Sequence, residues 1–110
     1  MSDTGDRVKE IFEQMPQRLD PDAANGLDIV IQHDLTGDGG GGYYAAIKDG
    51  SCTVTEGTHD SPSMTMTIEA ADFVALLNGE LDGMTAFMGG KLKIAGDMSI
   101  AMKMQTLFKG

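Results

Sequence analysis

The side chains that could do chemistry are few in this sequence and lie far apart. The histidines are His33 and His59, the cysteine is Cys52, and no H-E-x-x-H spacing occurs. A zinc site needs several closely spaced nitrogen or sulfur ligands. The sequence therefore predicts no metal and no cofactor. Cys52 has no histidine nearby in the sequence, so we interpret it as a small buried side chain rather than a catalytic thiol.

A glycine-rich segment, Gly37-Asp-Gly39-Gly-Gly-Gly42, satisfies the G-x-G-x-x-G pattern of dinucleotide-binding proteins. That pattern binds phosphate when it opens a helix. Here it precedes Tyr43-Tyr-Ala-Ala-Ile-Lys48, which is typical of a strand, so we interpret it as a turn. A calcium loop counted from Asp34 is also disfavoured, because Ala45 stands where a bidentate glutamate is required.

Carboxylates for acid–base catalysis would come from Asp34, Glu69 or Asp72. A catalytic acid usually needs burial that shifts its pKa. Asp34 falls on the polar face of its predicted strand, whereas Glu69 and Asp72 suit a helix cap. One enzyme hypothesis stays open, a small-cavity enzyme of the steroid-isomerase type that uses Asp34 with Tyr43 or Tyr44. It requires the Asp34 side chain to lie inside.

Composition limits the class of protein. The chain has 110 residues, a net charge of −9 and 5% aromatic residues without tryptophan, a pattern that argues against nucleic acid as a partner. We expect one domain over residues 1–110. The N-terminus is polar and acidic, and the single cysteine suits a reducing compartment, so we expect a cytoplasmic protein.

The charge is unevenly distributed along the chain. Residues 91–110 carry +3, and all the residues before them carry −12. The lysines of this basic end have two interpretations. They could guide an anionic lipid headgroup or membrane surface, or they could protect an exposed edge strand from pairing.

The hydrophobic pattern predicts helices at both ends of a set of strands. Residues 3–15 have the spacing of an amphipathic helix that ends before Pro16, and residues 20–26 form a short helical turn. From Leu27 the period becomes two, and Asp49-Gly50 indicates a hairpin. Strands are predicted at about 27–35, 43–48, 51–56, 64–68 and 91–94, with helices at 70–78 and 83–88. This is a two-layer α+β arrangement, with helices covering one face of a sheet.

His33 and the last helix are the least ordinary features of this framework. The alternation places His33 on the apolar face of its strand, either as a hydrogen-bonded core residue or as a polar contact for a ligand. The helix after Asp97 has an apolar arc of about 220°, far wider than the roughly 100° stripe of a surface helix. Either the helix is sandwiched in a core, or part of the arc lines a cavity for an apolar ligand. Gln105 falls inside this arc.

Several segments resemble the sterol carrier protein 2 domain, over nearly the whole chain. They are Gly26-Leu-Asp-Ile-Val-Ile-Gln32, Ile47-Lys-Asp-Gly50, Ala71-Asp-Phe73, Asn78-Gly-Glu-Leu81 and, above all, Ala86-Phe-Met-Gly-Gly-Lys-Leu-Lys-Ile-Ala-Gly-Asp-Met-Ser-Ile-Ala-Met-Lys-Met-Gln105. The resemblance implies a five-stranded mixed sheet, covered on one face by about five helices, with an apolar tunnel between the layers.

The same resemblance implies a non-catalytic carrier of fatty acids, acyl-CoA, phospholipids or sterols. The implied lining residues are Ile31, His33, Phe73, Leu77, Phe87, Met88, Leu92, Met98, Met102, Gln105 and Phe108. Methionine suits such a wall because its flexible side chain adapts to variable apolar shapes. In relatives the position of His33 commonly holds an aromatic or aliphatic residue.

Further expectations concern partners and source. We expect a small-molecule lipid as ligand, and transient contact with a membrane surface or a lipid-metabolising enzyme. The protein would be a monomer or a weak homodimer, of the stand-alone prokaryotic type, since the end Phe108-Lys-Gly110 lacks a peroxisomal signal. The alternative to a carrier and to an enzyme is an interaction module whose Met-rich helix seals a dimer.

Overall fold

A computed structural model describes residues 3–107, which form one sheet and four helices. The helices are α1 (Asp3–Arg18), α2 (Ala70–Leu77), α3 (Gly83–Met88) and α4 (Met98–Leu107). The strands are β1 (Asp28–Thr36), β2 (Gly41–Lys48), β3 (Ser51–Glu56), β4 (Met64–Glu69) and β5 (Leu92–Gly96). The strand order across the sheet is β3-β2-β1-β4-β5.

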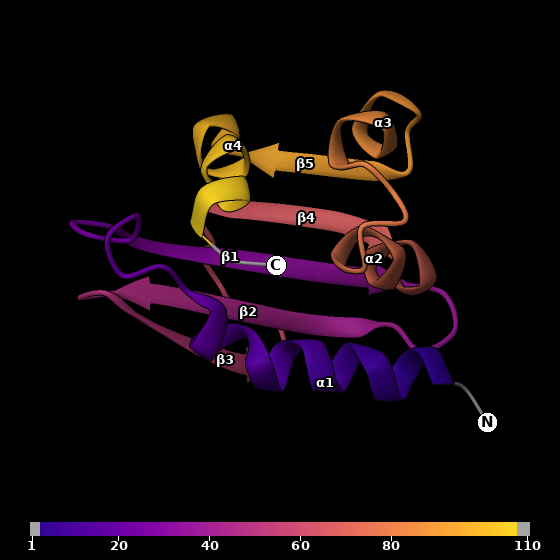
Figure 1. The fold of residues 1–110 in the computed structure, drawn as a ribbon, viewed down its shortest axis with the longest axis horizontal. Coiled ribbons are helices and arrows are strands. Elements are labelled where there is room, and N and C mark those ends of the chain that lie inside the picture. The colour runs from indigo at the N-terminus through magenta and orange to yellow at the C-terminus, as the bar shows by residue number, and fades with distance from the viewer. Residues whose placement is uncertain (1–2, 108–110) are drawn as a thin grey trace.

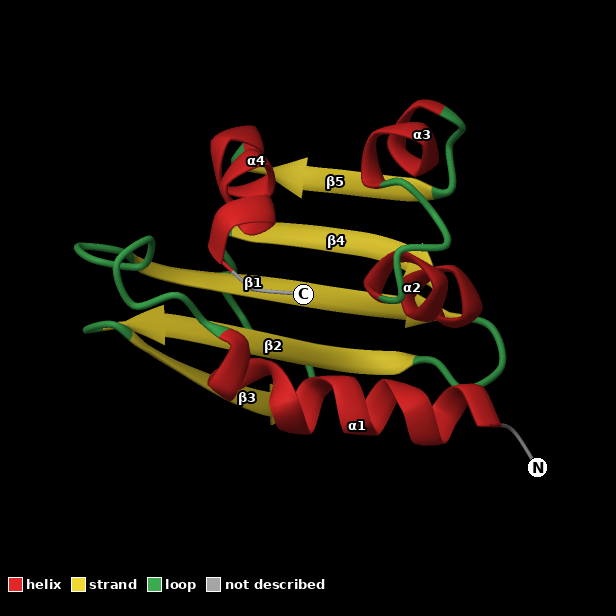
Figure 2. Ribbon diagram, in the orientation of Figure 1, coloured by secondary structure: helices red, strands yellow, loops and turns green. Residues whose placement is uncertain are grey.

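All four helices lie on the same face of the sheet (Figure 1), and Figure 2 shows the resulting two layers. The β1–β4 pair is parallel and the other three pairs are antiparallel. The predicted two-layer α+β fold with a mixed sheet is therefore confirmed. The described residues contain four helices where about five were expected, because residues 21–26 form a turn rather than a helix. Asp20 still caps this turn, accepting a hydrogen bond from the Asp22 N–H at 3.0 Å.

Helix α1 differs from expectation at its end. Pro16 was expected to end it, but the helix continues to Arg18 with Pro16 in its last turn. Proline at this position removes one N–H donor near the helix terminus, where few further bonds depend on it. The stripe of Val8, Phe12 and Met15 packs inward as its spacing predicted.

The central strand β1 determines which side chains lie beneath the helices. Ile31, His33 and Leu35 are buried on the helix-covered face, because successive residues of a strand point to opposite faces. His33 is paired with Tyr43 of β2 on one side and with Met66 of β4 on the other. The hairpin predicted at Asp49-Gly50 is confirmed, with both residues at positive φ.

The segment after β3 crosses the opposite face of the sheet to reach β4 (Figure 1). Gln32 of β1 holds this crossing. Its amide nitrogen donates to the carbonyl oxygen of Gly57 at 3.0 Å, and its amide oxygen accepts from the N–H of His59 at 2.8 Å. Ser63 closes the crossing by donating its N–H to the carbonyl of Val30 at 2.8 Å.

The glycine-rich segment is a tight turn against α1, as expected, and not the opening of a helix. Gly39 has a φ of +81°, and a Cβ added there would lie 2.7 Å from the Gly5 nitrogen. Glycine is therefore required for conformation and for space.

Replacing Gly39 with alanine should destabilise the fold more than the same change at Gly79. Gly79 has nearly the same φ, +80°, but open space where the Cβ would lie. We expect Gly79→Ala to cost about 1 kcal/mol, from the left-handed backbone alone, and Gly39→Ala to cost clearly more. Urea unfolding of both variants measures the difference, and equal losses would show that the contact with α1 is unimportant.

Candidate functional site

The candidate site is the apolar layer between the helices and the sheet. Of the residues predicted to line it, Ile31, His33, Phe73 and Leu92 are buried there, and Leu77 is half-buried. Ile31 and His33 come from the centre of the sheet, Leu92 from the edge strand, and Phe73 from α2 above it. The structure thus brings these residues from three elements, β1, β5 and α2, into one layer.

The apolar side chains of α3 and α4 lie at the rim of this layer. The exposed fractions are Met84 59%, Phe87 40%, Met88 79%, Met98 46% and Met102 75%. Both helices pack against β5 at opposite ends of that strand (Figure 1). Four of the predicted lining residues, Phe87, Met88, Met98 and Met102, are therefore uncovered by the protein's own core.

The wide arc predicted for the last helix is divided between core and surface. Ile100 and Leu107 are buried, and they fix α4 to its own sheet. Met98 and Met102 belong to the same arc and remain exposed. The Gln105 side chain and Phe108 lie outside the part of the structure that is described, so their predicted roles stay predictions.

His33 is the polar exception within the buried layer. Its side chain is 0% exposed, and neither Nδ1 nor Nε2 makes a hydrogen bond. The rings of Phe12 and Phe73 approach it edge-on, with centroids 5.2 Å and 5.9 Å away. Burial lowers the pKa of His33 to about 4, against a smaller opposing effect of the backbones of Tyr43 and Ile31, so the imidazole is neutral at pH 7. His33 is therefore a buried core residue, and neither ring nitrogen has a hydrogen bond of ordinary distance and angle.

Phe12 is a component of the site that the sequence did not single out. Its ring stacks on Tyr43 with a centroid distance of 4.1 Å and on Phe73 at 5.4 Å, as well as meeting His33. The spacing of α1 showed only that Phe12 would be buried. It carried no signal for which strand residues it would meet, since that depends on how α1 lies across the sheet.

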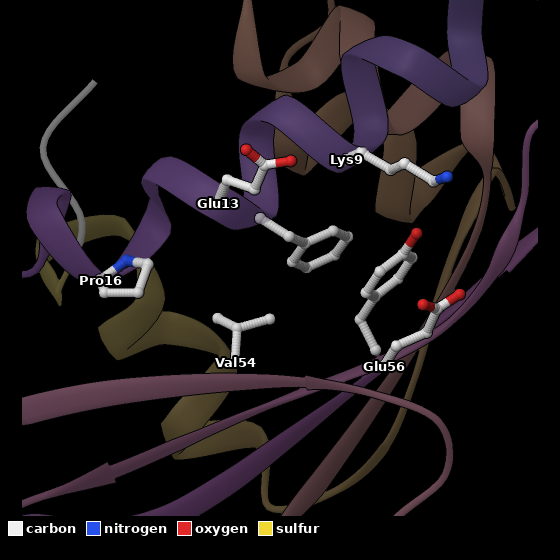
Figure 3. Close-up of a pocket in the computed structure, with 7 residues that line it drawn as sticks. Lys9, Glu13, Pro16, Val54 and Glu56 are labelled. Atoms are coloured by element: carbon white, nitrogen blue, oxygen red, sulfur yellow. The ribbon is translucent and has the colours of Figure 1, made fainter.

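A surface cleft of about 420 Å³ lies between α1 and β3, with Phe12 and Tyr43 in its wall. Lys9 of α1 and Glu56 of β3 lie at one end of it, and Pro16 and Val54 lie toward the other (Figure 3). Burial and, secondarily, the negative charge of Glu56 raise the pKa of Tyr43. The charged side chains of Lys9 and Glu56 make this end of the cleft polar.

The residues of the enzyme hypothesis are not assembled as it requires. Asp34 lies on the face opposite the helices and accepts a hydrogen bond from the Gln32 amide at 3.2 Å. Tyr43 is buried on the helix-covered face, so Asp34 and Tyr43 are separated by the sheet. Tyr44 shares the face of Asp34, but its ring packs edge-on against His59. The geometry does not support the pair of Asp34 with Tyr43.

The described residues give little support to metal or thiol chemistry. Among the described residues, no group of three or more His, Cys, Asp or Glu side chains could hold a metal ion. Cys52 is half-buried, and burial raises its pKa to about 11. A thiol with a raised pKa is a poor nucleophile at neutral pH, in agreement with a packing role.

A family model of the "SCP-2 sterol transfer family" matches residues 8–109. The chain belongs to this family. It is similar to hydroxysteroid dehydrogenase-like protein 2 of Bos taurus, with 33% identity over 101 residues. That match covers 91% of this chain and 24% of the bovine protein, so the chain spans about a quarter of the length of that relative.

Solved structures of sterol carrier proteins have the same fold as this SCP-2 chain. The crystal structure of sterol carrier protein 2 like 2 from Aedes aegypti has a TM-score of 0.72 and 27% identity, covering 89% of this chain and 93% of that one. A solution structure of the palmitated mosquito protein has a TM-score of 0.73 and 24% identity, covering 94% and 91% of the two chains. The latter likeness supports the fold alone. No helix among the described residues of this SCP-2 chain is long and apolar enough to span a membrane.

Proposed function

We propose that this protein is a non-catalytic carrier that holds a lipid between its helices and its sheet. The observation that carries the proposal is the group of exposed apolar side chains on α3 and α4, which flank the edge strand of an otherwise apolar layer. Membership of a sterol transfer family supports it. We expect it to act in the cytoplasm.

The energetics of a lipid ligand are favourable. Burying a dozen methylene groups contributes about 10 kcal/mol at about 0.8 kcal/mol each. Association costs about 4 to 15 kcal/mol. At the low end of that cost about 6 kcal/mol remains, which corresponds to a Kd of tens of micromolar. An empty apolar chamber of about 300 Å³ would cost about 7 kcal/mol. The rings of Phe12 and Phe73 instead pack on His33 beneath α1 and α2, and flexible methionines lie at the β5 side. Such a layer can open for a ligand and close without one.

The first experiment measures binding directly. The purified protein is extracted with organic solvent for mass spectrometry, and the delipidated protein is titrated with a fluorescent fatty acid. Saturable binding is expected. The absence of both co-purified lipid and saturable binding would refute the carrier function.

A matched pair of double variants locates the site. Met98→Gln with Met102→Gln removes apolar surface from α4 at positions already exposed, so stability should be unchanged. Lipid affinity should fall about tenfold to a hundredfold, because the ligand would cover these side chains. The control is Thr53→Gln with Thr55→Gln, on the exposed part of β3. Equal affinities of the two variants would place the lipid elsewhere.

The exposed apolar side chains also favour one alternative, an interaction surface for a second copy, a membrane or a lipid-metabolising enzyme. Helix α4 packs on its own sheet, which argues against a dimer formed by exchanging that helix. Analytical ultracentrifugation with and without bound lipid separates the two functions. A monomer in both states would favour carriage, and a dimer of equal stability in both states would favour an interaction surface.

A further inference from the structure

The unpaired imidazole of His33 is the feature of the buried layer that apolar packing does not explain. A buried polar group without a hydrogen bond is costly, about 1 to 3 kcal/mol, and is rare in native proteins. Both nitrogens of His33 are in this state, at the centre of the sheet. A neutral imidazole has one N–H donor and one nitrogen acceptor, so its complement is a group that both accepts and donates.

His33 stands in a row of side chains that crosses the helix-covered face. The strand register aligns Glu56, Tyr43, His33, Met66 and Ile94, in the order β3, β2, β1, β4 and β5. With neighbouring strands about 4.8 Å apart, the row is about 19 Å long. On one side of His33 it ends at the cleft of Lys9, Tyr43 and Glu56. On the other side it is apolar and ends at β5, between α3 and α4.

This row has the polarity of an amphipathic lipid. Its apolar half, over Met66 and Ile94, leads to the exposed side chains of α3 and α4. Its polar half begins at His33. A lipid placed with its apolar body toward β5 therefore presents its head to the imidazole, once the flexible Met66 side chain moves aside. Phe12 and Phe73 cover His33 on the helix side and shield the head from water.

The charge of the head can also be inferred. The rings and strand neighbours that surround His33 are Phe12 of α1, Phe73 of α2, Tyr43 of β2 and Met66 of β4, none of which is cationic. A carboxylate buried there would lose its hydration and would meet no permanently charged partner. A hydroxyl group can donate to the unprotonated ring nitrogen or accept from the ring N–H, whichever faces it, and it carries no charge.

From this arrangement we infer that His33 is a ligand-binding residue that hydrogen-bonds the uncharged hydroxyl head of a lipid. The inference rests on the proposed carrier function. Two lipid classes share this chemistry, long-chain alcohols and sterols. They differ in the width of the body that must pass over Met66 and Ile94.

The test compares matched ligands on the delipidated protein at pH 8, by displacement of a fluorescent fatty acid. 1-Hexadecanol should bind about tenfold more tightly than 1-methoxyhexadecane, which lacks the O–H donor. This preference should disappear in His33→Leu, with each affinity expressed relative to that of hexadecanoate for the same protein. Cholesterol serves as the sterol arm. Loss of cholesterol affinity in His33→Leu assigns the site to both lipid classes, and unchanged cholesterol affinity restricts it to alcohols.

Nitrogen-15 NMR of the His33 ring in the unmodified protein supplies a readout that does not depend on a variant. Saturation with 1-hexadecanol should shift the unprotonated ring nitrogen, which accepts from the O–H, and 1-methoxyhexadecane should leave that nitrogen unshifted. Binding of all ligands with no hydroxyl preference, or with unchanged ring shifts, overturns the role of His33 and leaves the carrier function intact. A greater loss of affinity for hexadecanoate than for 1-hexadecanol in His33→Leu would show a charged head at this position. If no lipid binds at all, the carrier function itself fails.

Discussion

Replacing Gln32 with leucine is expected to lower the free energy of unfolding by about 2 to 5 kcal/mol, although leucine has nearly the same volume. The Gln32 side chain is buried and joins the central strand to the segment that crosses the sheet. Without it, the carbonyl of Gly57 and the N–H of His59 lose their partners. Urea unfolding monitored by circular dichroism measures the change.

The isosteric variant Gln32→Glu shows which half of the amide matters. Glutamate can still accept from the N–H of His59, but it replaces the donor with a carboxylate that faces the carbonyl of Gly57 and the carboxylate of Asp34. We expect a loss at pH 7 at least as large as that of Gln32→Leu, and partial recovery relative to the parent protein near pH 4.5. Gln17→Leu, at an exposed position of α1, is the control and should change stability by less than about 0.5 kcal/mol. Unfolding midpoints of both Gln32 variants equal to that of the parent would contradict this role.

The second large effect is a loss of stability in acid that originates at His33. Its pKa is about 4 in the folded protein, against 6.5 as the ordinary value. In this pH range the unfolded chain therefore binds a proton that the folded chain excludes. The contribution to stability is complete above pH 6.5 and decreases as the pH falls toward 4. It amounts to about 2 kcal/mol lost at pH 5 and about 3 kcal/mol lost at pH 4.

The variant His33→Leu isolates this contribution from the other titrating groups. It removes two unpaired polar atoms, so we expect it to be more stable than the parent at pH 7, by about 1 to 3 kcal/mol. The difference between the two proteins should widen from pH 7 to pH 4, because only the parent takes up a proton at this position on unfolding. Denaturant midpoints at half-unit pH steps measure it. Parallel pH profiles would show that His33 is not held neutral by burial.

These two neighbouring residues illustrate how much of the fold could be predicted. The period-two pattern of β1 placed His33 and Gln32 on opposite faces, and the structure confirms it. Strand residues alternate regardless of the rest of the fold, so local sequence is sufficient. What each side chain meets depends on segments distant in the sequence. Gln32 shares the face of Asp34, which the sequence predicted to be polar, but the crossing segment buries Gln32, and no local pattern encodes that path.

The same reasoning applies to the candidate site. The width of the apolar arc on the last helix was readable from residue spacing alone. Which residues of the arc are buried was not readable. Ile100 and Leu107 are buried, whereas Met98 and Met102 are exposed. The difference depends on how α4 packs against β4 and β5. Similarly, spacing predicted that Phe12 would be buried, but only the position of α1 against β3 and α2 brings it onto Tyr43 and His33.

The sequence by itself determined the identity and order of most elements, the burial of the central strand and the resemblance to lipid carriers, because periodicity and turn residues act over a few positions. The tertiary structure decided how β3 connects to β4, that Pro16 lies within α1, and that the imidazole of His33 is buried without a hydrogen bond. These features depend on contacts between segments separated by tens of residues. The interactions that stabilise these features form only when the helices pack on the sheet.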